Sequence, residues 1–369
     1  MQFIDLKSRH QLIKDQIDAR VQKVMEHGQF ILGPEVKELD QKLAEYVGCK
    51  HCISVSSGTD SLLIALMALG VGAGDEVITV PYTWISSAEV IALLGAKPVF
   101  VDILPDTWNM DEQLLESVIT DKTKAIMPVS IYGQTSAMDS INEIANKYDL
   151  PVIEDAAQSF GATYKEKKSC DLSTIGSTSF FPSKPLGCYG DAGALFTNDD
   201  ELAEKFRWIR VHGQERKYHH PILGLNGRMD TLQAAILLEI FEVFPDEVVK
   251  RQEIGDRYNT ELSEASGLET PSIAPENTSV FAQYTILSEQ RESIQSALKD
   301  KDIPSVSYYS VPLHLQPVFK DLGYKAGDFP ITERIANQCL SLPMSPYLSD
   351  EDQNKVIEAI RHSATLSSY

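Results

Sequence analysis

The stretch Cys52-Ile53-Ser54-Val55-Ser56-Ser57-Gly58-Thr59 decides the fold class, because an apolar run ends in a small polar turn and a helical pattern follows directly. Cys52–Val55 predicts a buried strand, and Thr59–Leu69 predicts a helix because its apolar residues lie three and four positions apart. The glycine and hydroxyl groups of the turn leave backbone N–H groups at a positive helix end, which suits a phosphate. An N-cap that serves the helix alone is an equally good interpretation of this turn.

The same alternation of strand and helix continues to about residue 200. The further predicted strands are Val77–Val80, Pro98–Val101, Ala125–Val129, Pro151–Glu154, Ser177–Phe181 and Ala194–Thr197, and the further predicted helices are Ser86–Leu94, Asp111–Ile119 and Met138–Tyr148. This pattern favours βαβ units and an α/β fold with a mostly parallel sheet that has helices on both faces. In such a sheet, ligands bind at the carboxyl ends of the strands.

The pattern changes after Asp230, where the sequence predicts a smaller α+β domain. Its predicted helices are Thr231–Phe244, Asp246–Ala265, Ser293–Lys299 and one from Asp350, and its predicted strand is the alternating run Val280–Leu287. Pro245 separates the first two helices, because proline breaks or kinks a helix interior. We therefore expect an N-terminal segment and large domain over residues 1–245 and a small C-terminal domain over residues 246–369.

The net charge excludes several classes of partner. The chain carries 33 Lys and Arg against 53 Asp and Glu, a formal charge of −20, which repels nucleic acids and anionic membranes. The N-terminus has no apolar core of a signal peptide, and no window is long and apolar enough to span a membrane. We expect a cytoplasmic protein whose partners are small molecules or a second copy of itself.

The cysteines and histidines indicate neither a disulfide framework nor a metal site. Five cysteines are an odd number and lie far apart along the chain. Cys49 and Cys52 match a C-x-x-C pattern, but no second pair follows at zinc-site spacing, so we interpret them as thiols at a strand entrance. His219 and His220 have no further ligand in sequence and are interpreted as a loop near a partner subunit.

Two further segments carry residues suited to catalysis. Asp155 follows a hydrophobic strand at the carboxyl edge of the expected sheet, and Gln158 comes about one helical turn later. Such an acid binds a metal, caps the next segment or holds a proton on a cofactor, and metal ranks lowest because no His or third acid is near. Lys184 lies between Pro182 and Pro185, which fix its backbone, and a partly desolvated amine is what a Schiff base needs.

Four motifs in one order resemble the DegT/DnrJ/EryC1/StrS family of pyridoxal-phosphate (PLP) sugar aminotransferases. They are Ser57-Gly58-Thr59, the run from Glu154 to Ser159, the run from Ser179 to Gly193 and the run from Gly224 to Asp230. The resemblance extends from Phe3 to Met344. It implies the type I, aspartate aminotransferase-like fold with a mostly parallel seven-stranded sheet, PLP as cofactor, and a homodimer with shared active sites.

The resemblance also implies the roles of the cofactor-binding residues. Lys184 matches the lysine that binds the cofactor covalently and shuttles the proton, and Asp155 matches the acid that pairs with the ring nitrogen. Gln158 is expected at the phenolic oxygen, and Trp84 over the ring face, with simple packing as the alternative. The phosphate is expected at Gly58, Thr59 and Ser179 of one subunit and Asn226 of the other.

Within the family, the segments His27–Pro34 and Arg216–His220 are most similar to enzymes that aminate UDP-2-acetamido-2-deoxy-3-oxo-glucuronate for bacterial surface polysaccharide, with glutamate as the expected donor. Amination of a 4-keto-6-deoxy sugar is the alternative, and a PLP-binding regulatory protein is a more distant one. A PLP dehydratase is disfavoured, because such relatives lack the lysine found at Lys184.

The expected substrate-binding residues are Gly28, Gln29, Phe30, Ser183, Arg228, Tyr308, Tyr309 and His314. Arg228 is the candidate for a sugar carboxylate, because its guanidinium fork suits two carboxylate oxygens, and an interface salt bridge is the alternative. Tyr308 stands where relatives commonly have His. A tyrosine hydrogen-bonds a sugar or phosphate but is not cationic near neutral pH, which puts a diphosphate-binding role there in doubt.

Overall fold

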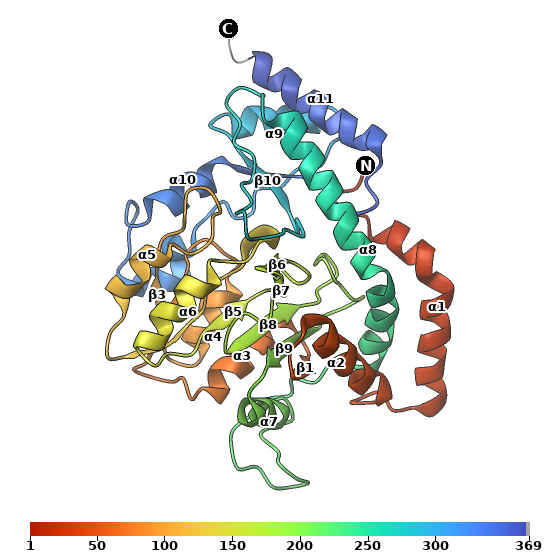
Figure 1. The fold of residues 1–369 in the computed structure, drawn as a ribbon, viewed down its shortest axis with the longest axis vertical. Coiled ribbons are helices and arrows are strands. Elements are labelled where there is room, and N and C mark those ends of the chain that lie inside the picture. Colours follow the sequence, from red (N-terminus) through yellow and green to blue (C-terminus); the bar gives the residue numbers. More distant parts are fainter. Residues whose placement is uncertain (367–369) are drawn as a thin grey trace.

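Seven strands form the central sheet within residues 1–366, the part of the chain that the structure, a computed structural model, describes (Figure 1). In spatial order they are β1 (His51–Val55), β9 (Gly193–Thr197), β8 (Ile175–Ser179), β5 (Ile153–Asp155), β4 (Thr123–Ile126), β2 (Glu76–Thr79) and β3 (Lys97–Phe100). Parallel bridges from Ile126 to Val152 and from Val129 to Asp155 join the two groups of strands. Only β9 is antiparallel to its neighbours, so the expected mostly parallel sheet is confirmed.

Helices cover both faces of this sheet. One face carries α1 (Leu6–His27), α2 (Pro34–Val47) and α8 (Thr231–Leu262), and the other carries α3 (Gly58–Ala68), α4 (Ser86–Leu93) and α7 (Asp200–Ile209). The split follows from the strand period, because successive side chains point to opposite sides. On β9, Phe196 packs in the core under α2 and α8, and the preceding Leu195 packs in the core under α3 and α7.

The prediction of a helix break at Pro245 is wrong. Thr231–Leu262 is one helix with Pro245 inside it (Figure 1). The proline removes one backbone hydrogen bond, a cost of about 3 kcal/mol in a helix interior. Phe244 and Val248 are both buried in the same core, so the packing of α8 continues across the proline and offsets that cost. The division of the chain at residue 245 stays a prediction, and this helix runs through it.

A smaller part lies beyond the end of the sheet, beside the C-terminal half of α8 (Figure 1). Its elements are β10 (Tyr284–Leu287), α9 (Arg291–Lys299), α10 (Pro330–Gln338), β11 (Cys339–Leu342) and α11 (Asp350–Leu366). The predicted strand Val280–Leu287 is half as long as expected, because Val280 hydrogen-bonds back to Gly133 of the large part. α9 and the start of α11 agree with the sequence.

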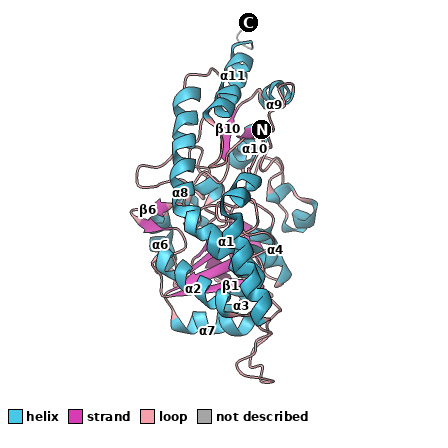
Figure 2. Cartoon of the chain, turned by 90° about the vertical axis from the view of Figure 1, so that its right-hand side faces the viewer, coloured by secondary structure: helices cyan, strands magenta, loops and turns pink. Residues whose placement is uncertain are grey.

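Short elements complete the large part. They are α5 (Glu112–Leu115), α6 (Met138–Lys147), β6 (Thr163–Tyr164) and β7 (Lys167–Lys168). The loop after α7 projects away from the body at the lower end of Figures 1 and 2 and carries exposed apolar side chains. Among residues 1–366, we find no helix with the length and hydrophobicity of a membrane span.

Candidate active site

A cavity of about 450 Å³ opens at the carboxyl ends of the parallel strands. The predicted site residues that line it are Gly58, Thr59, Trp84, Asp155, Gln158, Ser179, Ser183, Lys184, Tyr308 and Tyr309. They come from the ends of β1, β2, β5 and β8 and from the smaller part of the chain. The sheet therefore brings together residues that are more than 250 positions apart in sequence.

Lys184 lies on a tight turn after β8. Its backbone N–H donates to Phe181 O at 2.8 Å. Gly187 closes the turn, and a Cβ there would lie 2.5 Å from Pro182 O, so no larger residue fits. The side chain is only partly exposed, and the surrounding protein lowers the pKa of the Lys184 amine, while the charge of Asp155 raises it in part. Burial thus favours the neutral form of the amine, which is the form that acts as a nucleophile.

Asp155 is the acid at the cavity wall. Ser87 Oγ donates to its Oδ2 at 2.8 Å, and Ala157 N donates to its Oδ1 at 3.2 Å. Burial raises the pKa of Asp155, against the opposing effects of these donors and of the Lys184 charge. Burial thus disfavours the ionised form of this carboxyl group, and a cationic partner would stabilise that form.

Glu154, the neighbouring acid, has a structural role. It is fully buried and accepts hydrogen bonds from Ser130 Oγ at 2.9 Å, Ser169 Oγ at 2.7 Å and Cys170 N at 2.7 Å. Consecutive strand residues point to opposite faces, so only one of the two acids reaches the cavity. The structure thus places Asp155 there, as the sequence predicts.

Gln158 is held in a fixed orientation. Its Oε1 accepts from Tyr132 N at 2.9 Å, and its Nε2 donates to Tyr309 Oη at 3.2 Å. Burial keeps the pKa of Tyr309 well above its usual value, so this phenol is protonated at neutral pH. The Trp84 ring is 59% exposed and its centroid lies 6.1 Å from that of Tyr309, which leaves its other surface open to the cavity.

The start of α3 forms an anion cradle. Gly58 and Thr59 are its first two residues, so their N–H groups have no acceptor within the helix. A Cβ on Gly58 would lie 2.6 Å from Ser179 Cβ, which shows how closely the helix end approaches β8. Thr59 Oγ1 lies 2.8 Å from Ser86 Oγ. N–H groups, hydroxyls and a positive helix end fit a phosphate dianion.

Several predicted residues lie outside this cavity within the single chain. They are Gly28, Gln29, Phe30, Asn226, Arg228 and His314. Arg228 pairs through its backbone with Val55, next to the cradle, and its Nε is buried without a hydrogen-bond partner among the described residues. His314 is buried against Glu333, with 3.1 Å between Nε2 and Oε1. A second subunit was expected to supply Asn226, so these assignments stay predictions.

Other cavity residues were not anticipated from the sequence. They are Leu62, Thr83, Ser86, Ser87, Val129, Ala157, Phe181, Asp191 and Gln283. Ser86 and Ser87 had a readable signal, because they open a predicted helix directly after a strand end. Gln283 had none, because it reaches the cavity only through the packing of the smaller part against the sheet.

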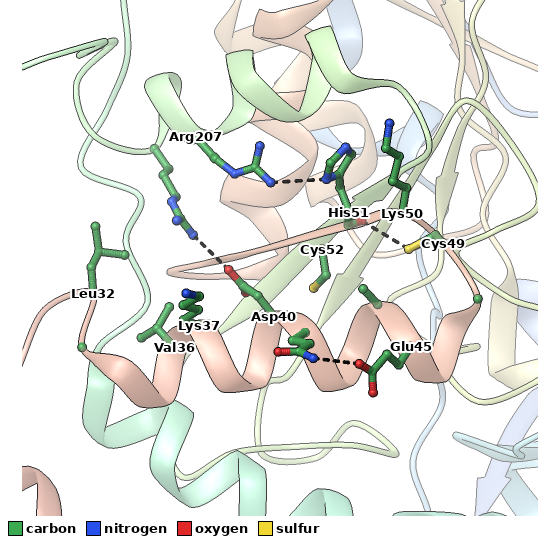
Figure 3. A pocket seen from close by; sticks show the side chains of 15 residues that line it. Leu32, Val36, Lys37, Asp40, Glu45, Cys49, Lys50, His51, Cys52 and Arg207 are labelled. Atoms are coloured by element: carbon green, nitrogen blue, oxygen red, sulfur yellow. Dashed lines mark hydrogen bonds and ion pairs between the residues drawn. The ribbon is translucent and has the colours of Figure 1, made fainter.

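A larger cavity of about 600 Å³ lies between α2, the start of β1 and α7 (Figure 3). Four of its polar side chains pair with one another: Arg207 Nη2 lies 3.4 Å from His51 Nδ1, and Arg210 forms an ion pair of 3.8 Å with Asp40. Asp40 and Arg210 also bind the backbone N–H and C=O of Ser54 at 2.8 and 2.7 Å. These contacts occupy the free edge of β1, so we assign this region a structural role.

The C-x-x-C cysteines lie at the same cavity and are free thiols. Cys49 Sγ donates to His51 O at 3.2 Å, and burial raises the pKa of the Cys49 thiol to about 11. In residues 1–366 we find no group of three or more His, Cys, Asp or Glu side chains arranged to hold a metal ion.

The sheet order, the anion cradle, and a lysine and a buried acid that line the same cavity are the features of a type I PLP-dependent aminotransferase. The chain belongs to the DegT/DnrJ/EryC1/StrS aminotransferase family, whose family model matches residues 11–361. The resemblance, the fold and the cofactor that the sequence implied are thereby confirmed.

Three similar proteins illustrate the match. The chain is 56% identical to a Pseudomonas aeruginosa UDP-2-acetamido-2-deoxy-3-oxo-D-glucuronate aminotransferase, over 94% of this chain and 96% of that protein. It is 47% identical to a Geobacillus stearothermophilus pleiotropic regulatory protein, over 97% of both. The crystal structure of a Brucella abortus aminotransferase of the family has a TM-score of 0.95 and 43% identity, over 98% of this chain and 99% of that one.

Proposed function

We propose that this enzyme transfers an amino group from glutamate to the 3-keto carbon of UDP-2-acetamido-2-deoxy-3-oxo-D-glucuronate, giving UDP-2-acetamido-3-amino-2,3-dideoxy-D-glucuronate for bacterial surface polysaccharide. The observation that carries this proposal is the 56% identity over almost the full chain to an enzyme named for that keto-sugar. The proposal places the enzyme in the cytoplasm, with a UDP-sugar as substrate.

Lys184 is the proposed catalytic residue. Its amine would hold the cofactor through the aldehyde carbon, and as a free amine it would move a proton at the reacting carbon of the substrate. PLP supplies the electron sink for this chemistry when it is bound. The direction of the shift in the pKa of the Lys184 amine supports the role, because burial favours the neutral form of the amine, which is the form that accepts a proton.

The other cavity residues orient the cofactor. Asp155 would pair with the protonated ring nitrogen, and the hydrogen bonds from Ser87 and Ala157 favour the ionised carboxylate that this pairing needs. Gln158 holds the phenolic oxygen, because Tyr132 and Tyr309 fix the orientation of its amide. The cradle of Gly58, Thr59 and Ser179 binds the phosphate.

Arg228 is the proposed partner of the sugar carboxylate. Its buried Nε lacks a hydrogen-bond partner in the part of the chain that is described, so this guanidinium has capacity to bind a further anion. The other proposed substrate contacts are Gly28, Gln29, Phe30, Ser183, Tyr308, Tyr309 and His314.

A homodimer with shared sites completes the proposal. Tyr218 and Leu223 on the projecting loop are 85% and 87% exposed, and Phe30, Ile31 and Leu32 form a second exposed apolar group. Such side chains favour burial against a second copy. The same loop leads into Asn226, which would then contact the phosphate in the partner's cavity.

A regulatory protein without turnover is the second candidate, supported by the name of the Geobacillus relative. Parallel assays of the UDP-3-keto-uronate and a dTDP-4-keto-6-deoxy sugar, each with glutamate, distinguish the proposed enzyme from one that acts on the 6-deoxy sugar and from a regulatory protein. Amination of the uronate supports the proposal, preference for the 6-deoxy sugar overturns its substrate, and absence of turnover with both favours the regulatory candidate.

A further inference from the structure

A buried ion pair lies beneath the turn that carries Lys184. Arg9 of α1 and Glu247 of α8 are 3% and 4% exposed. Arg9 Nε donates to Glu247 Oε1 at 2.8 Å and Arg9 Nη2 donates to Oε2 at 2.7 Å, which is the two-point geometry that fixes both side chains.

The guanidinium of Arg9 also binds backbone carbonyl groups that follow Lys184 in the sequence. Arg9 Nη2 donates to Pro185 O at 3.0 Å, and Arg9 Nη1 lies 3.5 Å from Gly187 O. These carbonyls belong to the residues one and three positions after Lys184. The position of the turn is thus coupled to the position of the ion pair.

One more side chain binds Glu247, and the charge of a further arginine acts on it. Tyr347 of the smaller part donates its hydroxyl to Glu247 Oε1 at 2.6 Å. Arg251, one turn further along α8, is fully buried, and its pKa is lowered to about 10 by burial and by the charge of Arg9. Glu247 therefore keeps Tyr347 and a nearby cation when Arg9 is replaced, so variants at position 9 are expected to fold.

We propose that Arg9, fixed by Glu247, is a positioning residue that sets where the Lys184 amine lies in the cavity. The inference rests on the proposed role of Lys184 and deepens it. A reacting group must be held within about 0.5 Å of its productive position, and a displacement of about 1 Å costs on the order of 10²-fold in rate. The two carbonyl contacts transmit the position of the ion pair to that amine.

The test compares Arg9→Lys and Arg9→Met with Arg20→Met. Arg20 lies on the same α1 and pairs with Glu239 of the same α8 and with Glu38, but it does not touch the Lys184 turn. The measurements are Tm, kcat, KM and the pH at which the absorbance band of the lysine-bound cofactor titrates. Lys184→Ala shows which band requires the lysine.

We expect all three substitutions to lower Tm. Both Arg9 variants are expected to shift the titration of the band and to lower kcat by roughly 10²-fold with KM little changed, and Lys is expected to be the milder substitution because it keeps the charge. Arg20→Met is expected to leave the titration and kcat unchanged. The inference is overturned if the Arg9 variants lower Tm alone, like Arg20→Met. A wild-type protein with no lysine-dependent band would instead contradict the proposed function itself.

Discussion

Ser87 Oγ donates a 2.8 Å hydrogen bond to Oδ2 of Asp155, so a hydroxyl at the start of α4 supports the acid at the end of β5. This contact stabilises the ionised form of a carboxyl group whose pKa is raised by burial. The strength with which Asp155 holds a protonated ring nitrogen therefore depends on a residue outside the family motifs that the sequence displays.

Ser87→Ala is expected to weaken PLP binding by roughly tenfold, because a hydrogen bond to a charged group contributes about 1.5–3 kcal/mol. Titration of the apo-protein with PLP, followed by absorbance, measures the Kd. Ser136→Ala is the matched control, since Ser136 is a buried hydroxyl that bonds Val129 O at 3.3 Å instead of Asp155. Equal Kd values for the two variants would contradict this role of Ser87.

The raised pKa of Asp155 gives the apo-protein a defined dependence on pH. Between the unfolded pKa of an aspartate, about 3.9, and the higher folded pKa, the folded state binds more protons, so stability falls as pH rises through this window. The Asp155→Asn variant has no titrating carboxyl group at this position, so it does not lose this stability as pH rises. The Tm of the variant minus that of wild-type apo-protein is therefore expected to increase with pH across the window and then level off. A difference that stays constant or declines as pH rises is incompatible with the assignment.

Gly58→Ala is expected to damage the anion cradle, because the new Cβ would lie 2.6 Å from Ser179 Cβ. Overpacking of this kind costs about 1–3 kcal/mol, and moving the start of α3 also weakens phosphate binding. Chemical denaturation and PLP titration measure the two effects. Gly72→Ala is the control, because a Cβ at Gly72 has no atom within 4 Å. A Gly58→Ala protein with normal PLP affinity would contradict the proposal that the start of α3 binds the cofactor phosphate.

Mixed dimers test whether Arg228 acts in the partner's cavity. Lys184→Ala and Arg228→Met homodimers are each expected to have little activity on the keto-uronate. Mixing them after subunit exchange is expected to restore activity, because one of the two hybrid sites then contains both wild-type residues. If Arg228 serves its own subunit, each hybrid site carries one defect and mixing restores nothing.

The sequence predicted the fold well because the strand and helix pattern is local, whereas the roles of the cofactor residues came from the resemblance to the family and stay predictions. Strand runs, glycine turns and the carboxyl ends of strands are readable in short windows, and the structure brings Asp155 and Lys184, which follow two such strands, to one cavity. The continuation of α8 through Pro245 was missed, because packing of Phe244 on distant segments outweighs the local effect of proline.

Contacts between segments that are distant in the sequence could not be predicted from the sequence alone. Arg9 and Glu247 are 238 positions apart, and no local pattern connects them. Gln283 likewise enters the cavity through tertiary packing alone. Asn226, which we propose to act in a second subunit, lies outside the cavity of the single chain, so its role is tested only in an assembled dimer.

The central claim, Lys184-dependent amination of a UDP-linked 3-keto uronate, is tested most directly by mass spectrometry of the products. The enzyme is incubated with PLP, glutamate and UDP-2-acetamido-2-deoxy-3-oxo-D-glucuronate, beside the Lys184→Ala variant. We predict that wild type forms the 3-amino sugar together with 2-oxoglutarate and that the variant forms neither. An unchanged keto-sugar with wild type, under conditions in which a 4-keto-6-deoxy sugar is aminated, would contradict the account.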